Sequence, residues 1–267
     1  MPTLIDTSYV IDIPSVLLLA AIYAVAAVFS GLSGFGFSAI GALSLVMLPP
    51  QLGVPVLMAL SVASQAPSYG SLARELRQHA GAWHRRDGVM PYMAGGVVGL
   101  PVGLAILSLL DARPLIACLG TLLVAYAAWS LHAPAHAVMA VPASSIRSAM
   151  LVGAVGGVVG SFAAFPGSAL VIWNGIVGRT KEQSRALTQP YILCMQLAAL
   201  LLLAPLHPKL FDISFWTLLA VALPGTLVGY QFGVTVYRRT GGPGYRRITL
   251  IMLGLAGAGL LLNLALG

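Results

Sequence analysis

The sequence Phe-Gly-Phe-Ser-Ala at positions 35–39 recurs 130 positions later as Phe-Pro-Gly-Ser-Ala at positions 165–169. Each copy interrupts a long hydrophobic run with glycine or proline and then offers a serine. Inside a lipid bilayer, backbone that leaves the helical pattern is tolerated only where protein or a water-filled cavity surrounds it. The two segments therefore predict two helix breaks that lie inside the protein, at corresponding positions of two similar halves.

The composition of the chain is that of a polytopic membrane protein. Of its 267 residues, 58% are hydrophobic and only 8% are charged, whereas a soluble domain has about 25% charged residues. Several uncharged stretches exceed the roughly 20 residues that cross a bilayer as a helix. The net charge of +7 comes from arginine and lysine in short loops, which is the pattern of cytoplasmic loops. We therefore expect a lipid bilayer and no nucleic acid among its partners.

An ordered series of matches extends the repeat beyond the two short segments. Gln65 corresponds to Gln196, and Gly120 corresponds to Gly254, at offsets slightly longer than that of the two breaks. Such a series indicates an internal duplication. Three glycines spaced four residues apart recur at the same offset as the breaks: Gly95, Gly99 and Gly103 match Gly225, Gly229 and Gly233. Glycines at this spacing allow close contact between membrane helices.

We expect an all-α polytopic membrane protein made of two inverted repeats. Residues 1–131 would form the first transmembrane repeat, 132–147 a linker, and 148–267 the second transmembrane repeat. Each repeat would contain a re-entrant, broken helical hairpin followed by three transmembrane helices. An odd number of crossings places the two repeats in opposite orientation, which brings the two breaks together near the middle of the membrane.

The two hairpins are expected at residues 14–48 and 148–178. In the hairpin at 148–178 each arm would have about 15 residues, and such an arm is about 22 Å long at 1.5 Å per residue. This length is shorter than the ~30 Å hydrocarbon core. If residues 148–178 instead crossed the membrane once, the basic residues that follow would face the outside, against the usual charge bias.

The residues around the breaks point to an anion. A helix that begins inside the membrane presents free backbone N–H groups and about half a positive charge, and it binds anions without a charged side chain. Ser38 and Ser168 begin the helices after the breaks, where each serine either caps its own helix or donates to a ligand. Gln65 and Gln196 lie deep in apolar spans, where an amide either serves an anion or bonds a neighbouring helix. The predicted substrate-binding residues are Gly36, Phe37, Ser38, Gln65, Pro166, Gly167, Ser168 and Gln196.

A second set of residues is expected to gate the site or to make secondary contacts. It comprises Ser33, Phe35, Ser64, Phe165, Asn174 and Tyr191. For the phenylalanines, simple packing against other apolar groups is the alternative to gating.

The sequence lacks the groups that other functions require. Every lysine, arginine, aspartate and glutamate can be placed in a loop or at a helix end, so no proton relay is expected inside a span. No cluster of aspartate, histidine or cysteine suits a metal ion, and no nucleophile stands beside a base as in an enzyme. We expect no enzymatic activity, no metal and no cofactor.

The chain resembles the TauE/SafE family of sulfite exporters. The resemblance rests on Gly-Leu-Ser-Gly-Phe-Gly-Phe at 31–37, the glycine-rich break at 153–167 and the Gly-x-x-x-Gly spans, and it runs from about Leu17 to the C-terminus. Members are small bacterial permeases of two similar halves, and those with an assigned role mostly move sulfite, sulfonates or related organic anions. The family pattern has three glycines after each break, where this chain has Phe-Gly-Phe and Phe-Pro-Gly.

The resemblance implies an exporter of a small organic or sulfur oxyanion in the bacterial inner membrane. An inside-negative potential drives a monoanion outward by about 2.3 kcal/mol per 100 mV, which is a driving force for ion uniport without a proton relay. The sequence leaves open whether a coupling ion, Na⁺ or H⁺, takes part. Two alternatives stay open at this point. One is a Na⁺-coupled importer of a small organic anion, and the other is a membrane assembly protein that does not transport.

The loop charges predict the topology, with both termini outside. Four loops are expected inside: 74–87, 132–147, 179–185 and 238–247. After replacement of Cys118 and Cys194, a single cysteine in place of Lys181 should react with an impermeant maleimide only from the cytoplasmic side. Labelling of that cysteine from outside would contradict a hairpin at 148–178.

Overall fold

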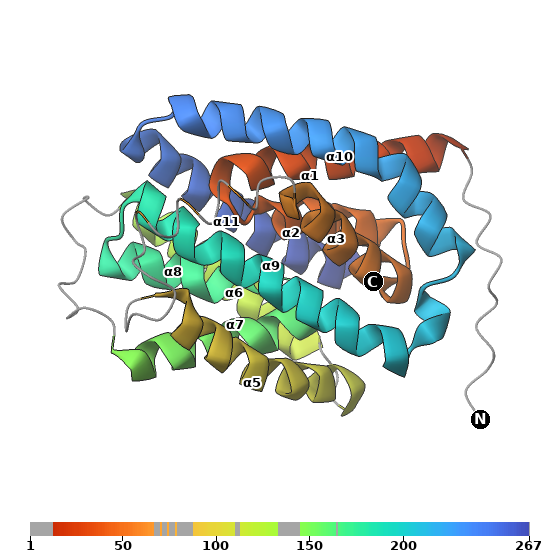
Figure 1. Ribbon diagram of the computed structural model, residues 1–267, viewed down its shortest axis with the longest axis horizontal. Coiled ribbons are helices and arrows are strands. Elements are labelled where there is room, and N and C mark those ends of the chain that lie inside the picture. The colour runs from red at the N-terminus through yellow and green to blue at the C-terminus, as the bar shows by residue number, and fades with distance from the viewer. Residues whose placement is uncertain are drawn as a thin grey trace.

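The computed structural model describes residues 13–66, 70, 74, 78, 88–109, 113–132, 145–163 and 165–266. These residues form helices and no strand, which confirms the predicted all-α class. The helices are α1 (Ile13–Ser33), α2 (Gly36–Gly41), α3 (Pro50–Gln65), α5 (Val89–Leu109), α6 (Arg113–His132), α7 (Ile146–Ala163), α8 (Gly167–Val177), α9 (Lys181–Leu206), α10 (Ile213–Arg239) and α11 (Gly242–Leu266), with 3-10 turns at Ala42–Val46 and Pro208–Leu210 (Figure 1).

The first predicted break lies between α1 and α2. Gly34 has a φ of 86°, a left-handed conformation that glycine adopts without steric cost. A Cβ on Gly36 would lie 2.9 Å from the backbone carbonyl of Phe29. The chain can therefore fold back against the end of α1 only because residue 36 is glycine.

The second predicted break lies between α7 and α8. Pro166 lies against Gly156 and Gly160 of α7, so the chain folds back here as well. Both breaks are thus confirmed, but the prediction of two arms of about 15 residues in the second hairpin is wrong. α1 and α7 have 21 and 18 residues, whereas α2 and α8 have 6 and 11. Each break follows the whole apolar run before it, and α8 ends early because Gly178 turns left-handed with a φ of 71°.

Among the described residues, four helices are long and apolar enough to cross a membrane. These are α1, α9, α10 and most of α11, and the remaining apolar helices are shorter. α1, predicted as one arm of a re-entrant hairpin, is about 31 Å long at 1.5 Å per residue and matches the ~30 Å core.

The most extensive packing joins helices from different halves of the chain. α1 packs along α10, α7 packs along α5, and α6 packs along α11. α1 and α7 are the first helices of the two expected repeats, and α5 and α10 carry the repeated glycines. Each of the three pairs therefore joins a helix of the first half to a helix of the second half.

The repeated glycines make the same contact in both pairs. A Cβ on Gly99 would collide with the carbonyl oxygen of Ala154, and a Cβ on Gly229 would collide with that of Ala24. Ala154 and Ala24 are separated by the same offset in the sequence as the two glycines. One turn further on, Gly103 meets Val158 and Gly233 meets Val28 in the same way. One interface is therefore used twice, and within each pair the two helices run in the same direction.

α6 and α11 run in opposite directions. Gly257 lies against Gly120 and Leu123, whereas Gly254 lies against Ala127. The residue numbers thus increase along α6 in the direction in which they decrease along α11.

One end of the bundle gathers basic residues. Lys181 Nζ at the start of α9 donates to the Thr240 carbonyl at the turn between α10 and α11, at 2.7 Å. Arg246 Nη2 donates to the Ser130 carbonyl near the end of α6, also at 2.7 Å. We call this side of the molecule the basic end. The segments 179–185 and 238–247 lie there together, and the side of the membrane that they face stays a prediction.

The predicted loop at 179–185 is wrong in its extent. Thr180 Oγ1 accepts from the Gln183 amide at 3.3 Å, and Gln183 Oε1 accepts from the Thr180 amide at 3.2 Å. This capping box starts α9 at Lys181, five residues before the apolar run begins at Ala186. Residues 242–247 likewise belong to α11. Most of the predicted loops 74–87 and 132–147 lies outside the described residues.

The glycine contacts predict different effects for two substitutions on one helix. Gly229→Ala should lower the melting temperature in detergent, because overpacking costs about 1–3 kcal/mol. Gly225→Ala is the matched control, since its Cβ would find its nearest neighbour at 3.4 Å and alanine favours a helix by up to about 1 kcal/mol over glycine. Equal melting temperatures for the two variants would contradict the proposed contact.

Candidate functional site

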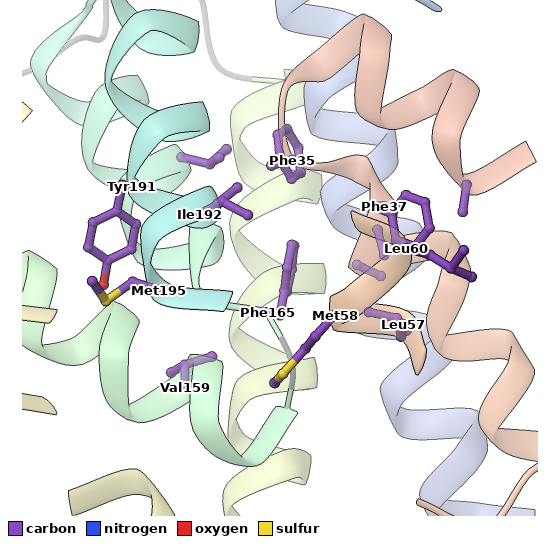
Figure 2. Close-up of a cluster of buried hydrophobic side chains, with 14 of the residues drawn as sticks. Phe35, Phe37, Leu57, Met58, Leu60, Val159, Phe165, Tyr191, Ile192 and Met195 are labelled. Atoms are coloured by element: carbon purple, nitrogen blue, oxygen red, sulfur yellow. The ribbon is translucent and has the colours of Figure 1, made fainter. Parts of the chain in front are cut away.

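The two breaks meet in the centre of the molecule. The rings of Phe35 and Phe165 stack with their centroids 6.1 Å apart, and a Cβ on Gly167 would lie 3.3 Å from Phe35 Cβ. Figure 2 shows both rings inside the buried cluster, which also includes Met58 and Ile192. Residues that correspond in the two halves therefore contact each other, and their rings close the space between the breaks.

One face of α9 passes both breaks. A Cβ on Gly34 at the first break would lie 3.1 Å from Gln189 Cγ, and one on Gly167 at the second break would lie 2.5 Å from Ile192 Cδ1. Gln196 follows Ile192 by four residues, so it projects from the same face one turn later. Gln196, a predicted ligand residue, therefore lies on the helix face that passes both breaks, one turn beyond the residue that contacts the second.

The side-chain amide of Gln196 has no hydrogen-bond partner on either its nitrogen or its oxygen among the described residues. Its exposed fraction is 1%. Gln65 is equally buried, and its Nε2 donates to the Ser61 carbonyl at 3.1 Å and to Ser61 Oγ at 3.2 Å. Gln65 Oε1 has no hydrogen-bond partner among the residues that the structure describes. A buried polar group without a partner costs about 1–3 kcal/mol, so such groups point to a ligand or an ordered water.

Two of the serines at the breaks form hydrogen bonds with the neighbouring backbone. Ser168 Oγ donates to the Phe165 carbonyl at 3.0 Å. Ser33 Oγ accepts from the Gly36 amide at 3.0 Å, so this amide of the first break already has a partner. Ser38 lies buried in the first turn of α2. For Ser168 and Ser33 the hydrogen bonds are those of a structural role.

Two of the predicted secondary residues bond to nearby backbone. The Tyr191 hydroxyl donates to the Gly153 carbonyl of α7 at 2.6 Å, and Ser64 Oγ donates to the Ser61 carbonyl at 2.8 Å. Both side chains are completely buried. Tyr191 therefore ties α9 to α7.

Asn174 lies near the far end of α8, away from the break. Its Nδ2 donates to Ser184 Oγ at 3.1 Å and to Thr188 Oγ1 at 3.0 Å. Its Oδ1 accepts from Arg179 Nη1 at 3.2 Å, and Arg179 Nη2 donates to the Tyr92 hydroxyl at 3.1 Å. The amide of Asn174 is thus fully used in fastening α8 to α9 and α5 at the basic end.

Arg185 is the residue that the sequence interpretation placed wrongly. It was expected in a loop, but α9 begins at Lys181 and carries Arg185 one turn into the helix, where only 3% of it is exposed. Arg185 Nη1 donates to the Gly31 carbonyl at the end of α1, at 2.5 Å, and Nε donates to Gln189 Oε1 at 2.9 Å. Gln189 Nε2 donates in turn to the Tyr230 hydroxyl at 2.7 Å.

The sequence held a signal for this cluster. Arg185, Gln189, Ile192 and Gln196 follow at intervals of four, three and four residues, which is the spacing of one helix face. Polar residues on that stripe of an otherwise apolar span indicate an interior face.

A membrane bundle with two helix breaks in contact, and with unpaired amides buried inside it, has the construction of a membrane transporter. The family comparison names the kind. The chain matches the sulfite exporter TauE/SafE family over residues 19–260. Because this match covers most of the chain, the chain belongs to that family. It is a multi-pass membrane transporter and not an enzyme, and the family implies an anionic substrate. Comparisons with curated proteins and with solved structures gave no match.

The two glutamines of α9 should respond oppositely to the same substitution in the ligand-free protein. Gln189→Leu removes a group that bonds Arg185 and Tyr230, so it should lower the free energy of unfolding by about 1–3 kcal/mol. Gln196→Leu removes an unpaired buried amide and should leave stability unchanged or raise it. Thermal unfolding in detergent measures both. A large loss of stability in Gln196→Leu would mean that this amide is structural.

Proposed function

We propose that the protein exports a small organic or sulfur oxyanion, such as sulfite or a sulfonate, across a bacterial inner membrane. The observation that carries the proposal is Gln196, whose buried amide is unpaired among the described residues and lies one helical turn beyond Ile192, the residue against Gly167 of the second break. An amide N–H directed into such a site is a suitable donor for an anionic oxygen. The family of the chain supports an anionic substrate.

The anion would bind between the breaks without a charged side chain against it. The first turn of α8 contributes backbone N–H groups and the positive end of an eleven-residue helix. Gln196 and Gln65 contribute amides, and Ser168 can redirect its hydroxyl toward the ligand. The first break would contribute less through its helix end, because α2 has only six residues and Ser33 already accepts from Gly36. All the predicted site residues stay part of the proposed site, with most of the affinity placed on the second break and Gln196.

The two halves would be inverted repeats, with residues 1–131 and 148–267 joined by the linker 132–147. The antiparallel contact of α6 and α11 supports this proposal, because these two helices occupy corresponding places in the halves. A two-fold rotation that exchanges two antiparallel helices has its axis perpendicular to both helices. If the helices span the membrane, this axis lies in the plane of the membrane. Each repeat would then present its break from the opposite side, as in other inverted-repeat carriers.

The two glycine-packed pairs, α1 with α10 and α5 with α7, would act as the rigid bodies of the transport cycle. Their close backbone contacts resist deformation, so alternating access would come from movement of one pair against the other. Separation of Phe35 from Phe165 would open the site. The membrane potential would drive export of a monoanion, at about 2.3 kcal/mol per 100 mV.

Coupling to Na⁺ is the less suitable mechanism for this chain. The carbonyls exposed at the end of α1 would be the ligands for a sodium ion at the first break, but Gly31 accepts from Arg185 and Ser33 accepts from the Tyr245 hydroxyl. A guanidinium at this point repels a second cation. Anion export and Na⁺-coupled import are separated by flux into proteoliposomes: we expect sulfite flux that follows the imposed potential and is unchanged when choline replaces Na⁺.

The site predicts which variants lose anion affinity. Purified protein would be screened by thermal shift against sulfite, sulfate, thiosulfate, a sulfonate and simple carboxylates, and affinity would be measured for the best ligand. Gln196→Ala and Ser168→Ala should each lower affinity roughly 10- to 150-fold, the effect of losing a bond of about 1.5–3 kcal/mol to a charged group. Gln65→Ala and Ser38→Ala should lower it less.

The melting temperature of each ligand-free variant provides the control for this experiment. A purely structural serine or glutamine would lower stability and leave affinity unchanged in the molecules that fold. If none of the four variants changes affinity, the anion binds elsewhere.

A further inference from the structure

We propose that Arg185 holds the first break closed toward the basic end and releases it when an anion replaces the Gly31 carbonyl as the acceptor of its hydrogen bond. We call this contact of Arg185 the latch. The identity of the anion in this inference rests on the proposed function, whereas the closing contact itself does not depend on it. Arg185 is a positioning residue in this scheme, since it acts on the site through the end of α1.

Arg185 contacts the first break at two points. Its guanidinium donates to the Gly31 carbonyl at 2.5 Å, three residues before Gly34, and its Cγ would lie 3.4 Å from a Cβ on Gly34. A cation at a helix C-terminus interacts favourably with the helix dipole, so this bond stabilises the end of α1 in its present place. The bond is buried and charge-assisted, which makes it strong.

Neighbouring groups fix the guanidinium in this position. Gln189 Oε1 accepts from Nε, and the ring of Tyr237 lies under the guanidinium with its centroid 4.1 Å from Cζ. Tyr237 packs edge to face with Tyr245, whose hydroxyl donates to the Ser33 carbonyl at 2.9 Å. α9, α10 and α11 therefore hold the end of α1 together, all from the basic end.

The second break has a different partner in the corresponding place. At the offset that relates Gln196 of α9 to Gln65 of α3, Arg185 corresponds to Val54 and Gln189 to Met58. Met58 of α3 lies in the same buried apolar cluster as Phe165 (Figure 2). The two halves thus share the break but not the polar group beside it. The barrier on the basic side includes a charged hydrogen bond, whereas the one on the other side consists of apolar packing.

This difference connects anion entry to opening. An anionic oxygen is a stronger acceptor for a guanidinium than a neutral carbonyl. An anion that arrives from the basic end can therefore replace the Gly31 carbonyl on Arg185, which frees the end of α1 and lets the first break move.

Cysteine labelling tests the latch without any assumption about the substrate. In a chain with Cys118 and Cys194 replaced, a cysteine is introduced at Ala39 or at its counterpart Ala169, and its reaction with an impermeant maleimide is timed from the basic side. Arg185→Gln should raise the rate at position 39 roughly 10- to 100-fold, the factor that loss of one charged hydrogen bond produces. The rate at position 169 should stay within about twofold.

Matched variants separate the latch from general loosening. Arg247→Gln removes an exposed arginine from the same end and should change neither rate. Arg185→Lys keeps the cation but cannot reach both Gly31 and Gln189, so its rate at position 39 should fall between native and Arg185→Gln. This variant decides the question if Arg185→Gln does not fold. Equal rises at both positions, or no rise at position 39, would overturn the latch.

Addition of sulfite then tests the release. In the native background, sulfite should speed labelling at position 39, and in Arg185→Gln it should have no further effect. If Arg185→Gln raises the rate but neither sulfite nor any other anion of the screen changes the native rate, the latch stands and its release by an anion is wrong. If the anions bind and Arg185→Gln changes nothing, the proposed function stands and the latch is wrong.

Discussion

Backbone that leaves the helix inside a bilayer has no water to bond with, so it must be enclosed by protein. In this chain the enclosure comes from pairing helices of different halves. α1 lies on α10 and α7 lies on α5 so closely that glycine is required where the carbonyls of Ala24 and Ala154 approach. These two pairs hold the ends of α1 and α7 in place, and the breaks that follow are pressed against each other through Phe35 and Phe165. Every other feature of the site depends on that contact.

The polar groups inside the bundle fall into two kinds. Asn174, Tyr191 and Gln189 use their polar atoms on neighbouring helices, and their removal would leave those partners unpaired. Gln196 differs, because among the described residues its amide stabilises nothing in the empty protein. A chain that keeps such a group buried gives up stability for it. That cost is the physical reason to place the anion beside Gln196 and not beside the better-bonded residues.

The repeated glycine contacts give the two helix pairs the same interface, and in the proposed transport cycle the differences between the halves would give transport a direction. The glycine contacts repeat at one offset, so the scaffold is the same seen from either half. The residues that line the breaks do not repeat: α9 brings Arg185 and Gln189 to one break, whereas α3 has Val54 and Met58 at the corresponding positions. A symmetric scaffold with unequal barriers responds differently to an anion on its two sides.

The sequence by itself determined the helical class, the two breaks and the use of the glycine series, because each of these follows from local composition and spacing. Glycine at 34 and 36 and proline at 166 end helices wherever those helices lie, and four-residue spacing puts glycines on one face. The sequence alone did not determine the lengths of the hairpin arms or the burial of Arg185. A capping box moved the start of α9 back to Lys181, and the carbonyl that Arg185 meets belongs to Gly31, in the other half of the chain. Which glutamine is satisfied and which is left unpaired was likewise decided only in the folded molecule, because a hydrogen-bond partner is supplied by packing between distant helices and not by the residues next to it in sequence.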